Sequence, residues 1–369
     1  MKKIIWTLVI LVVVAVFGGR AWWLYQHKET QASALKIGLL TVQSGQYAQM
    51  GQEVNNGAIL AMEEINSQTN TKIQLLLEDS KAVSKDALNA FNKLLFSNVK
   101  AAVVVGDNQI LPTAHLIDEK GLPTVVVATG SIGYLKQNNK HYMYHFSPSN
   151  YSCSFSVGKY AKDVLNLKKV AVLKMNSVFG EEGAKGFVDG YGQSPMATEE
   201  FKMDEQDAKN SVLKILDSNP DGIYITGYGA SYVSAIKRLK EYGFSGKILS
   251  EPAISNLVAS FNPIKMVDGI LFAEAKDLTT NSNFALFSKN YEKRFGEKPT
   301  AMSAQGYEAI RLLYNAYQAN PENIQAGLVG IKEFDNLFGK VTFSDDGNSS
   351  FEMSIKQMQS DGTAKIIKE

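Results

Sequence analysis

From Leu35 onward, short apolar runs alternate with stretches whose apolar residues recur at helical spacing. Lys36–Leu40, Ile73–Leu77 and Ala101–Val105 are typical of strands, whereas Gln52–Asn66 and Ser84–Phe96 are typical of amphipathic helices. The strand-like runs are continuous and rich in β-branched residues, as in a parallel sheet that helices cover on both faces. The alternation therefore predicts an α/β fold built from repeated βαβ units.

The alternation of strand-like and helix-like segments stops in a polar stretch at residues 133–150 and then resumes, which predicts a second α/β unit of similar size. A chain of 369 residues is long enough for about two domains. The further expected strands are Thr124–Ala128, Lys169–Lys174, Gly222–Thr226, Lys247–Ser250, Ile270–Ala273, Lys340–Phe343 and Phe351–Met358. The further expected helices are Pro112–Glu119, Ser156–Leu165, Gly180–Gly192, Ser211–Asp217, Tyr232–Tyr242, Phe284–Phe295 and Ser303–Ala319.

Composition and missing motifs exclude several functions. With 38 basic and 37 acidic residues, the net charge of +1 offers no field that would hold a nucleic acid. The single cysteine, Cys153, excludes an intrachain disulfide and a cysteine-cluster metal site. No phosphate-binding loop, dinucleotide fingerprint, G-x-S-x-G elbow or H-E-x-x-H is present, and the histidines are not spaced as metal ligands. We therefore expect no catalytic residue, no metal and no cofactor.

The N-terminal 34 residues are typical of an export segment rather than of the fold. Lys2 and Lys3 precede an apolar run from Ile4 to Phe17. A peptidase could release the protein, or residues 4–25 could remain as an anchor in the inner membrane, with Trp22, Trp23 and Tyr25 at the membrane surface. Both alternatives place the body of the protein outside the cytoplasm, in the periplasm.

Candidate ligand-binding residues follow the expected strands. Ligands of parallel α/β sheets bind at the carboxyl ends of strands. The loops at those ends are rich in glycine, hydroxyl, amide and aromatic residues, which suits a small polar ligand. The candidates in them are Ser44, Tyr47, Met50, Asn108, Gln109, Ala128, Thr129, Phe179, Tyr228 and Glu251.

Several segments, in this order and spacing, resemble the type I periplasmic binding proteins, in particular the leucine/isoleucine/valine-binding branch. They are Ile37–Leu40, Ser44–Gly51, Asn56–Asn66, Ala128-Thr129, Phe179–Gly183, Gly227-Tyr228, Gly306–Ala309 and Val341–Gly347. The resemblance implies two Rossmann-like lobes with parallel sheets, joined by three hinge crossovers near Ser147–Asn150, Phe272–Lys276 and Lys340–Ser344. It divides the chain into residues 35–148 with 275–342 and residues 149–274 with 343–369.

The resemblance also implies a role for particular residues. Thr129 and a hydroxyl after the third strand would bind a ligand α-carboxylate, Glu251 would bind an α-ammonium, and Met50 would touch the ligand side chain. Phe179 and Tyr228 would line the cleft. The chain departs from the family at Gly106–Ile110, which lacks the hydroxyl, at Tyr144-His145-Phe146, where the family has an arginine, and at Phe179, which replaces a tyrosine.

The function implied is capture of a small polar solute and its delivery to an ABC permease, without chemistry. The departures widen the expected ligand from an amino acid to a related amide or peptide. The alternative is a membrane-anchored sensor that works with a receptor partner.

Overall fold

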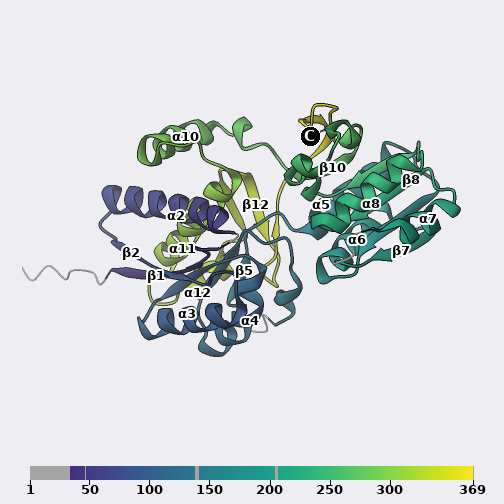
Figure 1. Cartoon of the computed structure of the whole chain (residues 1–369). Coiled ribbons are helices and arrows are strands. Elements are labelled where there is room, and N and C mark those ends of the chain that lie inside the picture. The colour runs from purple at the N-terminus through teal and green to yellow at the C-terminus, as the bar shows by residue number, and fades with distance from the viewer. Residues whose placement is uncertain (1–33, 46, 138–140, 204–206, 369) are drawn as a thin grey trace, which may run out of the picture.

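The computed structural model describes residues 34–45, 47–137, 141–203 and 207–368. These residues form two α/β lobes that lie side by side (Figure 1). The central strands of each lobe are parallel and helices cover both faces of each sheet, which confirms the predicted fold class.

The sheet of the first lobe has the strand order β2-β1-β3-β4-β5, and all neighbours are parallel. Its strands are β1 (Leu35–Thr41), β2 (Ile73–Asp79), β3 (Ala101–Val105), β4 (Thr124–Val127) and β5 (Met143–His145). Its helices are α2 (Ala48–Gln68), α3 (Ser84–Phe96), α4 (Asp107–Lys120), α10 (Ser282–Phe295), α11 (Ala301–Ala319) and α12 (Ile324–Gly330), with 3-10 turns η1 (Gly133–Gln137) and η4 (Leu278–Thr280).

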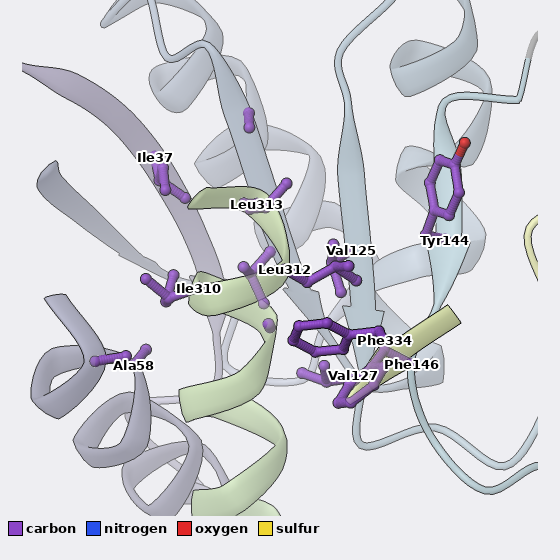
Figure 2. Close-up of a cluster of buried hydrophobic side chains, with 14 of the residues drawn as sticks. Ile37, Ala58, Val125, Val127, Tyr144, Phe146, Ile310, Leu312, Leu313 and Phe334 are labelled. Carbon is purple, nitrogen blue, oxygen red and sulfur yellow. The ribbon is translucent and has the colours of Figure 1, made fainter. Parts of the chain in front are cut away.

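Successive strand residues enter two separate cores, because side chains alternate across a sheet. Val125 and Val127 of β4 join a cluster with α2, α10 and α11, whereas Val126 points to α3 and α4. Figure 2 shows Val125 beside Leu312 of α11, and Val127 beside Phe334 and Phe146. Burial of one such aliphatic side chain contributes about 1.5–3 kcal/mol, so the two cores hold helices far apart in sequence on one sheet.

The sheet of the second lobe has the order β15-β14-β10-β9-β8-β6-β7 and is parallel from β7 to β10. Its strands are β6 (Val170–Met175), β7 (Ala197–Phe201), β8 (Gly222–Thr226), β9 (Lys247–Ser250), β10 (Leu271–Ala275), β14 (Met353–Met358) and β15 (Ala364–Lys368). Its helices are α5 (Asn150–Asp163), α6 (Val178–Tyr191), α7 (Lys209–Asp217), α8 (Gly229–Glu241) and α9 (Ala253–Asn256), with η2 (Val258–Ser260) and η3 (Ile264–Val267). The last two strands are antiparallel additions beside β10, drawn in yellow in Figure 1.

A small antiparallel sheet of β11 (Glu333–Asn336), β12 (Gly339–Phe343) and β13 (Ser349–Ser350) completes the first lobe. Phe343 and Phe351 pack around Phe146 in the first-lobe core, with ring centroids 6.4 and 5.5 Å from that ring. The third crossover therefore follows β13, near residues 351–352, and not Lys340–Ser344 as the sequence predicts. The hairpin stays with the first lobe because its aromatic side chains are buried there. The exact lobe boundaries stay a prediction.

Some elements differ from the sequence prediction. Helix α4 begins at Asp107, five residues before Pro112, which was expected to start it. The short strands β5, β7, β11 and β15 and helix α12 were not predicted, since their apolar pattern is too short or too polar. Within the described residues, no helix is long and apolar enough to cross a membrane. The predicted anchor or signal at residues 4–25 lies outside the described residues.

Candidate functional site

The carboxyl end of β1 leads into a loop that carries the first candidates. Ser44 is exposed, and its hydroxyl donates a hydrogen bond of 2.7 Å to Oδ2 of Asp79 at the end of β2. Tyr47 lies directly before α2 and is 47% exposed. Met50 is half-buried and its methyl group lies near Gly106, the residue after β3. The end of β1 thus places Tyr47 and Met50 near the start of α4.

The two candidates after β3 lie in different surroundings. Asn108 is exposed on the first turn of α4, whereas Gln109 is 2% exposed. The Gln109 amide donates a hydrogen bond of 2.9 Å to Oγ of Ser80, which itself donates to the carbonyl of Thr41. Gln109 therefore ties the ends of β1, β2 and β3 together inside the lobe.

Ala128 and Thr129 follow β4, and the backbone between them is unusual. Ala128 has a φ of 54°, a left-handed conformation that is uncommon for a residue with a Cβ. Its N–H donates a hydrogen bond of 2.8 Å to Oε1 of Gln305, a buried residue of α11. This hydrogen bond stabilises the turn at Ala128, and the turn sets the position of Thr129.

The Thr129 hydroxyl donates a hydrogen bond to the carboxylate of Asp107, at the start of α4. Burial raises the pKa of Asp107, although the hydrogen bonds from Thr129 and from the Ser131 N–H act in the opposite direction. His145 supports the same turn, because its Nε2 donates to the Thr129 carbonyl at 3.2 Å. Burial lowers the pKa of His145 to about 4, so this ring is neutral near pH 7.

The second lobe contributes two aromatic candidates. Phe179 lies on the first turn of α6 and Tyr228 directly precedes α8. Their rings meet edge to face, with centroids 5.4 Å apart. Tyr228 remains 41% exposed, so the pair keeps aromatic surface accessible.

Glu251 follows β9 and is 1% exposed. Its two carboxylate oxygens accept hydrogen bonds from the backbone N–H groups of Ala253 at 2.7 Å and Gly227 at 3.3 Å. Burial raises the pKa of Glu251 to about 8. Throughout the part of the chain that the structure describes, no lysine, arginine or histidine forms an ion pair with it.

Residues of the two lobes meet in front of these strands. The pKa of Tyr228 is raised mainly by burial, and further by the nearby carboxyl of Asp107 and hydroxyl of Tyr47 from the other lobe. The Phe179 ring packs on Gly130, where an added Cβ would lie 3.1 Å from Cε2 of the ring. We use the term interlobe site for Tyr47, Asp107, Thr129, Phe179, Tyr228 and Glu251.

A second link between the lobes is polar. Glu182 of α6 accepts hydrogen bonds from the Ser131 hydroxyl at 3.1 Å and from the Ile132 N–H at 3.1 Å. Burial raises the pKa of Glu182, and Asp107 adds to that rise. This carboxylate therefore lies close to the interlobe site and joins α6 to the loop after Thr129.

A cavity of about 660 Å³ lies between the lobes on the side of the crossovers. Ala128 and Thr129 line it from the first lobe, and Pro252 and Glu274 line it from the second. The other predicted site residues lie outside its lining. Thr129 therefore belongs both to the lining of this cavity and to the interlobe site.

Sequence reasoning missed Asp107, Glu182 and the supporting residues Ser80, Gln305 and Asn150. Asp107 stands between two residues that were considered, Gly106 and Asn108, and its position directly after a strand was the available signal. Glu182 lies in the segment Phe179–Gly183 that carries the family resemblance, but no role was predicted for it from the sequence. Asn150, which donates a hydrogen bond of 2.7 Å to the Phe179 carbonyl, carries no sequence signal, because only the packing of α5 on α6 brings it there.

Two α/β lobes with polar and aromatic residues at facing strand ends define a protein that binds a small molecule between lobes. The profile of the periplasmic binding protein family matches residues 34–363. The chain therefore belongs to the periplasmic binding protein family, as its sequence predicts. Members of this family are solute-binding proteins rather than enzymes, and the family implies an extracytoplasmic location.

Individual relatives are distant but cover nearly the whole chain. The Leu/Ile/Val-binding protein BraC3 of Rhizobium johnstonii is 21% identical, over 85% of this chain and 88% of the relative. The structure of LivJ from Streptococcus pneumoniae in complex with isoleucine has a TM-score of 0.73 at 22% identity, over 91% of this chain and 100% of that one. A solute-binding protein from R. palustris in complex with benzoate has a TM-score of 0.71 at 18% identity, over 91% and 96% of the two chains.

Proposed function

We propose that this protein captures a small polar solute at the interlobe site and delivers it to an ABC permease. The observation that carries the proposal is Glu251, a carboxyl group buried at the end of a strand, which has hydrogen-bond donors from the backbone but no ion-pair partner among the described residues. A buried acid without a counter-charge is costly for the free protein, and a ligand N–H group or ammonium would relieve that cost.

The other residues of the interlobe site fit the same role. Tyr228 and Phe179 offer an aromatic wall from the second lobe, and Tyr47 faces them from the first. A ligand between them would contact both lobes at once. The relatives named above support solute binding, although isoleucine and benzoate, the ligands in two of those structures, differ in everything except a carboxylate.

Titration calorimetry with Glu251→Gln tests the binding site. Loss of one partner of a buried charged pair costs about 2–5 kcal/mol. At about 1.4 kcal/mol per tenfold, the variant should bind an ammonium-bearing ligand roughly thirty-fold more weakly than the wild type. Glu322→Gln, at an exposed glutamate, is the matched control and should bind normally. Equal affinity of wild type and Glu251→Gln would remove Glu251 from the site.

Delivery to a permease needs a test in cells. Deletion of the gene should reduce uptake of the solute that the purified protein binds, and the wild-type gene should restore it. Normal uptake in the deletion strain, together with intact binding in vitro, would favour the alternative of a sensor that reports ligand occupancy to a receptor partner.

The attachment of the protein depends on residues 4–25. The apolar run with Trp22, Trp23 and Tyr25 at its end supports an anchored form, because these aromatic residues suit a membrane surface. N-terminal sequencing of the mature protein decides between the forms. A sequence that starts at Met1 in the membrane fraction supports the anchor, whereas a later start in the soluble fraction supports release.

A further inference from the structure

Asp107 sets this chain apart from what its resemblance implies for the ligand. It is the first residue of α4, directly after β3, and its carboxylate accepts the hydrogen bond of the Thr129 hydroxyl. The Ser131 N–H also interacts with this carboxylate. Thr129 is the residue expected to bind a ligand carboxylate, and here an acid of the protein itself is its partner.

Asp107 occupies the two features of this place that would otherwise bind an anion, the Thr129 hydroxyl and the N-terminus of α4. A hydroxyl has one proton to donate, and that of Thr129 is directed to Asp107. The N-terminus of a helix attracts negative charge, and the first turn of α4 already carries Asp107. A second carboxylate at this place would compete with Asp107 for the Thr129 hydroxyl and would face a like charge.

The surroundings offer no cation to offset that charge. In the described ranges of the chain, neither Asp107 nor Glu182 nor Glu251 forms an ion pair with lysine or arginine. His145, at the position where the family has an arginine, is fully buried and bonded to the Thr129 carbonyl. The interlobe site therefore presents hydrogen-bond acceptors from both lobes.

We propose that Asp107 excludes carboxylates from the interlobe site and selects a small solute that presents N–H groups to both lobes, as an amide or an amine does. This inference rests on the proposed function, since it concerns the solute that the same site binds. The solute would donate one hydrogen bond to Asp107 in the first lobe and another to Glu251 in the second. Its apolar part would lie against Phe179 and Tyr228.

Binding of compounds that differ in the carboxylate or the ammonium group of one parent amino acid tests the proposal. L-leucine, L-leucinamide, 4-methylpentanamide and 3-methylbutylamine share one side chain, and the alanine and phenylalanine series vary it. Titration calorimetry on the full chain should show the amide or the amine of at least one series binding tenfold or more tighter than the amino acid. In the leucine series, 4-methylpentanamide lacks the ammonium and 3-methylbutylamine lacks the amide. A comparison of these two compounds therefore identifies which group the site selects.

Asp107→Asn tests the residue itself. The variant removes the negative charge and keeps the shape of the side chain. The ratio of the affinity for the amide or amine to the affinity for the amino acid should therefore fall at least fivefold. Asp86→Asn is the matched control, because Asp86 also lies in the first turn of a helix, α3, away from the interlobe site. Its preference should equal that of the wild type. The wild-type preference stands as a test even where Asp107→Asn does not fold.

The outcomes separate the inference from the proposed function. If the wild type binds leucine as tightly as leucinamide and Asp107→Asn changes neither, Asp107 does not select the ligand, while solute binding stands. If no compound of any series binds the folded wild type, both the inference and the proposed site fail.

Discussion

At the scale of single residues, the interlobe site holds the carboxyl group of Glu251 in surroundings that disfavour its ionised form. Glu251 lies near enough to Tyr224 of β8, Tyr232 of α8 and Cys153 of α5 to raise the pKa of each, and none of the three carries a positive charge. Burial also raises the pKa of each of these three groups, so they stay neutral near pH 7. The free protein therefore holds an acid whose ionised form it stabilises poorly.

The ligand-free protein should lose stability through Glu251 as the pH rises. Its pKa is about 8 in the folded state and near the ordinary 4.5 in the unfolded state, so the folded state binds the proton more tightly. The contribution of Glu251 to the free energy of unfolding is therefore fully present below pH 4.5 and is lost as the pH rises to about 8. Glu251→Gln cannot ionise, so its stability relative to the wild type should rise by on the order of 4 kcal/mol up to pH 8.

Urea denaturation of both proteins between pH 5 and pH 8 measures this difference. Other buried acids act in the same direction but are common to both proteins, so the difference isolates Glu251. Glu322→Gln should follow the wild type at every pH. A difference that stays constant across this range would show that Glu251 does not titrate there.

At the scale of elements, α6 carries two residues of the lobe contact on one face. Phe179 and Glu182 are three positions apart and therefore lie on the same side of the helix. The position of α6 depends on its close packing against α5. A Cβ on Gly186 would lie 2.3 Å from the carbonyl oxygen of Tyr151, and one on Gly190 would lie 2.0 Å from that of Phe155.

Gly186→Ala should therefore force α6 away from α5. The added methyl group meets backbone, which yields less easily than a side chain, so the cost should reach the upper part of the usual 1–3 kcal/mol for overpacking. Gly330→Ala is the matched control, since nothing lies within 4 Å of a Cβ at that position. It should change stability by less than about 1 kcal/mol. Urea midpoints measure both, and equal midpoints for the two variants would contradict the close packing of α5 and α6.

At the scale of the whole molecule, few polar contacts cross between the lobes away from the crossovers. Glu182→Ala removes the acceptor of the Ile132 N–H. A hydrogen bond to a charged group contributes about 1.5–3 kcal/mol, so exchange of the Ile132 amide hydrogen should become about ten-fold faster or more. The Gln43 N–H, bonded to Asp79 at 2.8 Å within the first lobe, is the internal control. Unchanged exchange at Ile132 would show that another group protects this amide.

Ligand binding should bring the lobes together. A ligand that touches both lobes favours the closed arrangement, and backbone changes at the crossovers absorb the motion. A compact chain of this length has a radius of gyration of about 21 Å, and a two-lobed molecule exceeds it. Small-angle scattering should show a decrease toward that value with the tightest-binding compound of the panel above. Glu251→Gln at the same concentration should show little change, and a constant radius for the saturated wild type would contradict closure.

Much of the fold was predictable from local pattern. Ser84–Phe96, Ala101–Val105, Gly222–Thr226 and Lys247–Ser250 have the predicted bounds, because buried runs and helical periodicity depend on neighbours in the sequence. Strand β5 and helix α12 escaped prediction, since elements of 3 and 7 residues are too short to show a clear apolar pattern. The start of α4 was missed because Pro112 suggests a first turn, while the helix tolerates it in its interior.

The sequence by itself determined the class of the protein, because the alternation of strands and helices dictates parallel sheets, and it located the polar residues at strand ends where we propose that a ligand binds. Tertiary structure alone decided which of those residues act together. It placed Gln109 inside the lobe, brought Asp107 to the hydroxyl of Thr129, and kept the β12–β13 hairpin with the first lobe. The physical reason is that hydrogen bonds and burial between segments far apart in the chain, by 177 residues for Ala128 and Gln305 and by 202 for Ser147 and Ser349, have no local signal, so their partners become visible only when the chain is folded.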